Sequence, residues 1–282
     1  MKTKLILCFL VILLYQSSFA QLKNFDKNGK VKKAKAEKII IQIETPPTPP
    51  VNNQAAAIAL AAIGTGIDLG LNAVKTALAN REASFTSQYE VKTSNNNPFY
   101  DTNGEKINIS KVKITRQVTW KNNTTEGVSE IVLSVESKQT WFRFKTESVN
   151  IKYSKARIKK CGIYGKTIDL NIQIVMNAVW GDKDAKNNLI TQNGSLGSSS
   201  ITVKGITLGT PITDTYYSDW YTIIPNPLNR PTDNNYTIDV QVQEANPYGV
   251  TAKAISDFFN SNQTQIDSFL KSLIPSSSST SK

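Results

Sequence analysis

The chain has 282 residues, a formal net charge of +11, two cysteines and no histidine. Without histidine there is no Ser-His-Asp or Cys-His catalytic pair and no zinc site with imidazole ligands. Two cysteines are also too few for a thiolate cage around a metal, so we expect neither an enzyme nor a cofactor.

Residues 1–20 predict a secretory signal peptide. Lys2 and Lys4 precede the apolar run "LILCFLVILLY", and small residues stand before Gln21. This order is typical of export signals, and the apolar run is about half the ~20 residues of a membrane span. Gln21 stands where a lipoprotein would have cysteine, so we expect no lipid anchor. The expected location is the periplasm, the outer surface or the medium of a bacterium. After cleavage Cys161 is the only cysteine, which predicts no intrachain disulfide.

Residues 21–56 predict a basic and Pro-rich arm. The lysine-rich segment 27–38 predicts a weak helix, and Ile39–Thr45 predict one short strand. The following "PPTPPVNNQ" predicts an extended, polyproline-like spacer. An apolar strand between two such flanks is expected to join a sheet edge, either of this chain or of a partner.

Residues 57–82 predict an Ala/Gly-rich amphipathic helix. Its glycines do not form a dinucleotide-binding motif, because Leu69 stands where the third glycine is required. Asp68 would cost ~2.5–3.5 kcal/mol at a bilayer centre, which argues against a permanent span. Two alternatives remain: close packing on a sheet or partner, or conditional insertion into a membrane. The face that would contact a membrane or partner consists of Ile63, Gly66, Ile67, Gly70, Leu71 and Val74.

Residues 83–250 predict a β domain. Apolar and polar residues alternate most regularly over 168–180, and Asn/Gly-rich turns separate about seven to nine strands. Strands with one polar face are typical of antiparallel sheets, so we expect a sandwich or an open barrel. Residues 251–275 then predict a C-terminal amphipathic helix, and the Ser-rich residues 276–282 a disordered tail. The fold class is therefore mainly β, with one amphipathic helix on each side of the β domain.

The densest aromatic patch of the sequence supplies the candidate ligand-binding residues. Aromatic rings beside charged groups are typical of sugar or peptide recognition. These candidates are Tyr216, Tyr217, Asp219, Trp220, Tyr221 and Arg230.

Two other polar segments have simpler interpretations. The segment 181–188 resembles a calcium loop in its spacing of oxygens, but intruding lysines and the missing final glutamate favour a polar hairpin turn. The basic run 152–166 predicts a positive patch. We do not expect nucleic acid to bind this patch, because the chain is predicted to be exported. The expected ligand of such a patch is an anionic envelope polymer or a lipid surface.

The main functional hypothesis is an exported, non-enzymatic binding or assembly component of a bacterial envelope or extracellular structure. Its expected partner is an envelope protein or a second copy of the chain. Two alternatives stand beside it: a membrane-inserting protein that uses residues 55–78, and a glycan-binding or carboxylate-based glycan-acting sandwich that uses the aromatic patch.

Overall fold

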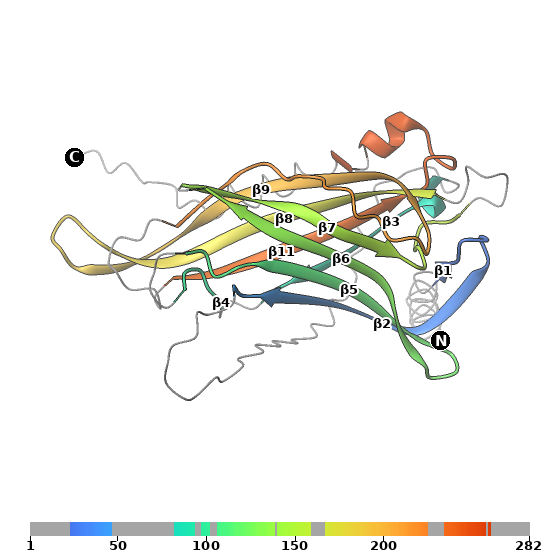
Figure 1. The fold of residues 1–282 in the computed structure, drawn as a ribbon, viewed down its shortest axis with the longest axis horizontal. Coiled ribbons are helices and arrows are strands. Elements are labelled where there is room, and N and C mark those ends of the chain that lie inside the picture. Colours follow the sequence, from blue (N-terminus) through green and yellow to red (C-terminus); the bar gives the residue numbers. More distant parts are fainter. Residues whose placement is uncertain are drawn as a thin grey trace, which may run out of the picture.

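The computed structural model describes residues 23–46, 82–93, 97–101, 106–138, 140–158, 167–224, 234–257 and 259–260. The predicted signal peptide, the Ser-rich tail and nearly all of the helix predicted over 57–82 lie outside these residues. The described residues form eleven strands in two antiparallel sheets, with little helix (Figure 1). The prediction of a mainly β, sandwich-like fold is confirmed.

Sheet 1 has six strands in the order β1-β2-β5-β6-β7-β10. Their bounds are β1 Lys23–Phe25, β2 Val31–Glu44, β5 Lys111–Trp120, β6 Thr125–Ser137, β7 Trp141–Ile151 and β10 Tyr221–Thr222. Three consecutive strands, β5, β6 and β7, pair as a meander, and β2 from the N-terminal segment pairs with β5.

Sheet 2 has five strands, four of them in the order β3-β11-β8-β9, while β4 pairs with the end of β11. Their bounds are β3 Thr86–Lys92, β4 Asn97–Pro98, β8 Thr167–Lys183, β9 Leu189–Thr207 and β11 Asn235–Ala245. A 3-10 turn at Glu82–Phe85 leads into β3.

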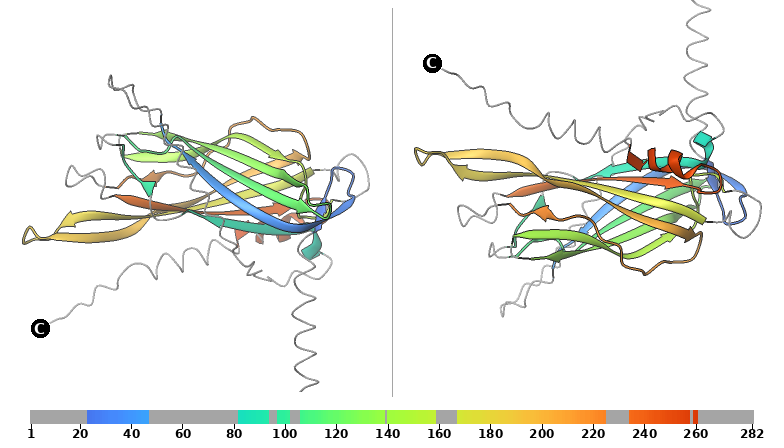
Figure 2. Two further views of the ribbon diagram at one scale, coloured as in Figure 1. Left: turned by 90° about the horizontal axis from the view of Figure 1, so that it is seen from below. Right: turned by 90° about the horizontal axis from the view of Figure 1, so that it is seen from above.

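The hydrophobic core lies between the two sheets, which Figure 2 shows as two layers. Ile114 and Ile131 reach it from sheet 1, and Ile172 and Ile238 from sheet 2, each at most 1% exposed. Burial of such a side chain stabilises the fold by about 1.5–3 kcal/mol. The buried Phe99 also packs edge-on against rings from both sheets, Phe142 and Tyr236.

The N-terminal segment differs from its prediction. Residues 27–38 were expected to be weakly helical, but from Val31 onward they belong to β2, which runs to Glu44. The register of β2 on β5 shifts between Ala34 and Ala36. At such a bulge the inward-facing positions change from even-numbered to odd-numbered residues. The sequence of β2 therefore shows no continuous two-residue period.

Residues 252–257 and 259–260 are helical and lie within the span 251–275 of the predicted C-terminal helix, which is not confirmed as a whole. The Thr251 hydroxyl accepts a hydrogen bond from the Ala254 N–H at 3.2 Å and so caps the helix. The helix packs through Ile255 and Phe259 next to Phe85, on the outer side of sheet 2 (Figure 2). The rest of the predicted helix over 251–275 lies outside the described residues and stays a prediction.

The turn between β8 and β9 is a polar hairpin turn, as the sequence predicted. The Asp184 carboxylate accepts hydrogen bonds from the Lys186 and Asn188 N–H groups, both at 2.8 Å. Asn187 adopts a positive φ of 66°. The oxygens of Asp184 thus serve the turn itself, which removes the main argument for a calcium loop.

Candidate binding surface

The predicted aromatic patch lies on a segment that crosses from sheet 2 to sheet 1. After β9, residues 208–222 run beside β7 in an antiparallel direction. Val149 and Ile212 exchange two backbone hydrogen bonds of 2.9 Å, and Ser218 donates to the carbonyl of Phe144. β10 then continues the pairing with β7. The segment therefore covers the outer edge of β7 and fixes where its aromatic rings point.

This segment divides its tyrosines between core and surface. Tyr221 is 1% exposed, stacks on Phe142 with ring centroids 5.3 Å apart, and donates a hydrogen bond to the carbonyl of Ile174 at 2.9 Å. Burial raises the pKa of Tyr221 far above its usual range. Tyr216 is partly buried against the same core. Tyr217, in contrast, is 48% exposed.

Tyr217 and Trp220 hold the guanidinium of Arg143 between them. The Cζ atom of Arg143 lies 4.0 Å from the ring centroid of Tyr217 and 4.5 Å from that of Trp220. Both distances are typical of favourable cation–π contacts. Glu136 on β6 accepts hydrogen bonds from Nη2 of Arg143 at 3.0 Å and from its Nε at 3.3 Å. The arginine is thus oriented by three side chains from two other segments, the segment 208–222 and β6.

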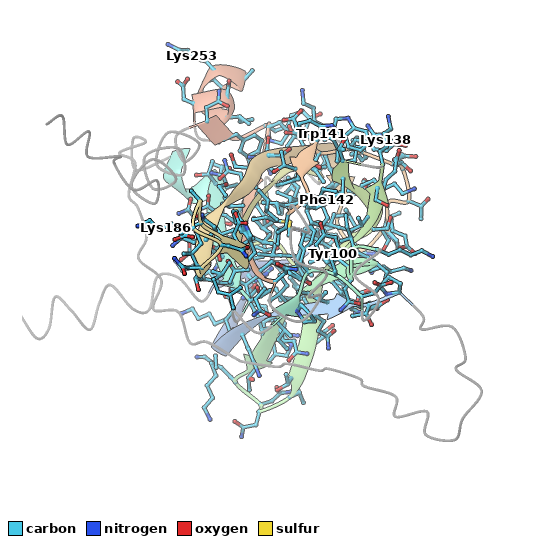
Figure 3. All side chains as sticks on the ribbon, turned by 90° about the vertical axis from the view of Figure 1, so that its left-hand side faces the viewer. Tyr100, Lys138, Trp141, Phe142, Lys186 and Lys253 are labelled. Atoms are coloured by element: carbon cyan, nitrogen blue, oxygen red, sulfur yellow. The ribbon has the colours of Figure 1, made fainter. Side chains whose placement is uncertain are left out.

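The turn between β6 and β7 extends this arrangement. Lys138 places its Nζ atom 4.6 Å from the ring centroid of Trp220, and its N–H donates to the carbonyl of Trp141. Trp141 is 46% exposed. Seen along the long axis, Lys138 and Trp141 lie near each other and apart from Lys186 of the β8–β9 turn (Figure 3). We call Lys138, Trp141, Arg143, Tyr217 and Trp220 the aromatic surface.

The sequence identified two of the five residues of this surface. Tyr217 and Trp220 were predicted, whereas Lys138, Trp141 and Arg143 were not, because they come from a distant hairpin. The signal available was alternation in "TWFRFK", which puts Trp141 and Arg143 on one face of a strand.

The remaining predicted residues have other positions. Asp219 is exposed, and its N–H donates to the Ser199 hydroxyl of β9 at 2.7 Å. Arg230 lies outside the described residues. So do the six residues of the predicted membrane or partner face, Ile63, Gly66, Ile67, Gly70, Leu71 and Val74.

Neither a metal-binding cluster nor a membrane-spanning helix is found within the described ranges. There, no three acidic, cysteine or histidine side chains gather closely enough to hold a metal ion. No helix among the described residues has the length and hydropathy of a membrane span.

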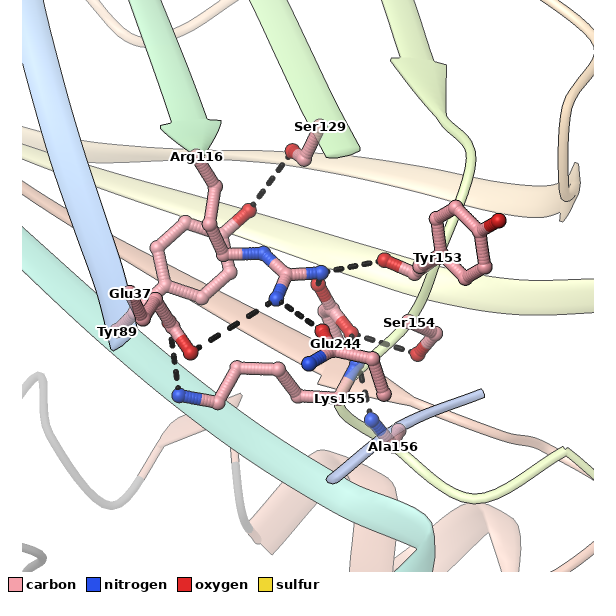
Figure 4. Close-up of polar contacts among 10 residues, drawn as sticks. Glu37, Tyr89, Arg116, Ser129, Tyr153, Ser154, Lys155, Ala156 and Glu244 are labelled. Carbon is pink, nitrogen blue, oxygen red and sulfur yellow. Dashed lines mark hydrogen bonds and ion pairs between the residues drawn. The ribbon is translucent and has the colours of Figure 1, made fainter. Parts of the chain in front are cut away.

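A second polar cluster lies buried between the sheets and was not predicted (Figure 4). Its centre is Arg116 on β5, which is fully buried and donates hydrogen bonds to the Asn24 side chain and the Tyr153 carbonyl. Carboxylate oxygens of Glu37 and Glu244 each lie 4.0 Å from its guanidinium nitrogens. Arg116 therefore joins its own sheet to Glu244 in the opposite sheet.

The two carboxylates have further partners. Glu37 accepts from the Lys155 ammonium at 3.0 Å. Glu244 accepts from the Ser154 hydroxyl at 2.6 Å and from the Lys155 N–H at 2.7 Å. Tyr89 lies beside Arg116, and burial, followed by the charge of Glu244, raises its pKa far above the usual range. Since Arg116 and Glu244 have no exposed side-chain surface, a substrate does not reach them, and the cluster is structural.

No protein-family model matches the chain, and no curated protein or solved structure matches it either. The functional argument therefore depends on the surfaces of this molecule.

Proposed function

We propose that this chain is an exported, non-enzymatic binding component of a bacterial envelope or extracellular structure, and that it contacts a protein partner through the aromatic surface. The observation that carries the proposal is the Arg143 guanidinium held between Tyr217 and Trp220. Together with Trp141, this set consists of the three residue types that dominate the energy of protein–protein interfaces.

The rigidity of the surface supports the same proposal. Arg143 is fixed by two rings and by Glu136, and the segment that carries the rings is hydrogen-bonded to β7. A side chain that is already ordered loses less conformational entropy when a partner binds, which leaves more of the contact energy for affinity. Trp141 next to this set offers a large exposed ring as an anchor.

The cation–π contacts favour a protein over a glycan. A sugar ring stacks on a free aromatic face, but Arg143 contacts Tyr217 and Trp220, and Lys138 contacts Trp220 a second time. These contacts leave less ring face for a sugar. Glycan binding is accordingly the alternative outcome of the test below rather than a second proposal.

The test is capture of partners from a native envelope extract by the folded, signal-free chain. The variant Tyr217→Ala/Trp220→Ala removes both rings around Arg143, and Tyr248→Ala removes an aromatic side chain of comparable exposure elsewhere, 43% against 48% for Tyr217. Loss of two interface anchors worth ~2 kcal/mol or more each weakens binding by about a thousandfold. The proposal predicts a protein that the double variant loses and the control keeps. Equal capture by all forms, or binding to glycans instead, would contradict it.

A further inference from the structure

The last strand of sheet 2, β9, is an edge strand with a long uncharged run. In the strand order β3-β11-β8-β9 its only ladder partner is β8. From Leu189 to Val203 it contains no charged residue and no proline. An edge strand with free backbone groups and neither of these features is a ready template for another strand.

The other described edges carry more protection. β1 and β2 form one edge of sheet 1, and β2 carries four lysines between residues 32 and 38, followed by the neutral residues 39–43. The other edge strand of sheet 2, β3, carries Glu90 and Lys92. The edge of β7 is covered by residues 208–222. Lysines and covering segments are the usual devices against edge pairing, and among the described edges β9 has the longest run without charge.

Part of β9 is covered, and the covered part ends before its tip. The Thr222 hydroxyl donates to the carbonyl of Leu196 at 3.0 Å, and Ser199 contacts Asp219. Among the described residues, the segment 208–222 forms no hydrogen bond of this kind with residues 189–195. This segment, which we call the open edge, is paired with β8 in regular register, from Lys183↔Leu189 to Asn177↔Ser195.

The open edge projects beyond the sandwich. The pairing of β11 with β8 ends at Asn235↔Val179, so β8 and β9 continue from there as a two-stranded ribbon (Figure 1). Near its tip Leu189 is 60% exposed, and Val179 is 41% exposed at its base. Two-stranded ribbons are marginally stable in water, and a third or fourth strand stabilises them.

We infer that the open edge pairs with the open edge of a second copy of this chain, in antiparallel register around a two-fold axis at Gln192. In this register Leu189 lies opposite Ser195 of the partner, and Thr191 opposite Asn193 of the partner. Such a contact uses one patch twice and closes as a dimer. Sheet 2 then continues across the dimer through eight strands of its main order, four from each copy.

Charge favours a second copy at this edge over the other described sheet edges. The chain carries a formal net charge of +11, so two copies repel each other in general. An uncharged strand can meet its own copy without placing like charges opposite each other, a contact that destabilises paired strands. The neutral run of the β2 edge, residues 39–43, is shorter and lies between Lys38 and Glu44.

The test uses charge at the two-fold axis. Gln192→Lys and Gln192→Glu each place two like charges opposite each other in a homodimer, whereas a mixture of the two variants places opposite charges there. Sedimentation equilibrium of the folded, signal-free chain should show a dimer for the wild type, with a dissociation constant raised at least about tenfold in either variant alone. The mixture should recover a 1:1 heterodimer.

Two further variants make the result decisive. Asn193→Pro removes a backbone donor from the open edge and should abolish the dimer, while Gln42→Lys on the β2 edge should leave it unchanged. Circular dichroism establishes that every variant is folded. A wild type that stays monomeric up to ~100 µM, where a constant of 10⁻⁴ M or tighter would be seen, overturns the inference. A dimer whose dissociation constant is unchanged by the Gln192 charges and by Asn193→Pro also overturns the inference. Neither result bears on partner capture by the aromatic surface, so the two proposals fail separately.

Discussion

Replacement of Arg116 by methionine tests whether the buried polar cluster holds the two sheets together. Methionine keeps most of the volume of arginine and removes its charge and donors, so little loss comes from packing. The variant leaves Glu37 and Glu244 buried without the cation that they share. It also leaves the Asn24 side chain and the Tyr153 carbonyl without their donor.

The expected loss follows from these contacts. Two hydrogen bonds from a charged donor are worth about 1.5–3 kcal/mol each, or roughly 3–6 kcal/mol together. An independent estimate comes from buried ion pairs, where removal of one partner costs about 3–5 kcal/mol of stability. We therefore expect Arg116→Met to lower the free energy of unfolding by about 3–5 kcal/mol, a large part of the 5–15 kcal/mol typical of a folded protein. Equilibrium unfolding in urea measures this difference.

The same strand offers a matched control on its other face. Lys113 forms an exposed ion pair with Glu130 at 2.7 Å, and such pairs contribute under about 1 kcal/mol. Lys113→Met should therefore change stability little. Adding Glu244→Gln to Arg116→Met should recover part of the loss, because Glu244 is the buried carboxylate that is left without a cation, whereas Glu37 keeps Lys155. The reasoning would be refuted if Lys113→Met and Arg116→Met lowered the free energy of unfolding equally. It would also be refuted if the added glutamine substitution recovered no stability.

Three further effects are expected. Gly197 has φ +142° and a Cβ there would lie 3.1 Å from Tyr221, so Gly197→Ala should cost more in urea unfolding than Gly209→Ala, where φ is +81° and the space is open. Tyr221→Phe removes a buried hydrogen bond and should lower the free energy of unfolding by about 0.5–1.5 kcal/mol, seen as a lower urea midpoint at unchanged slope. Burial raises the pKa of Tyr89, Tyr221 and Tyr236. Only the unfolded chain releases these protons above about pH 10, so stability should fall there by ~1.4 kcal/mol per pH unit for each tyrosine. Unfolding curves at stepwise higher pH test this, and flat stability would contradict it.

The inner strands were predictable because nothing interrupts their pattern. β8 places Ile172 and Ile174 in the core and Asn171 and Gln173 on its other face, as the alternation in the sequence predicted, although both polar side chains are also buried. The β8–β9 turn was equally predictable, since Asn187 and its neighbours are typical turn residues. In both cases local sequence and tertiary structure favour the same conformation.

The parts that were missed depend on distant partners. The bulge after Ala34 hides the period of β2, and its lysines mark a protected edge rather than a helix. Arg116 shares a face with Ile114 and Val118, so its inward position was visible in the alternation. Its acceptors, however, come from other segments of the chain. In the same way, no local pattern indicates that Arg143 lies between Tyr217 and Trp220.

The most direct measurement of the central claim is photo-cross-linking from position 141 in intact cells of the native host. A photoreactive amino acid replaces Trp141 in one form and Tyr248 in the other, and both positions are comparably exposed, at 46% and 43%. We predict that position 141 yields one dominant cross-linked envelope protein, and that Arg143→Ala in the same chain abolishes it. The same adducts from both positions, or no protein adduct from position 141, would contradict the claim.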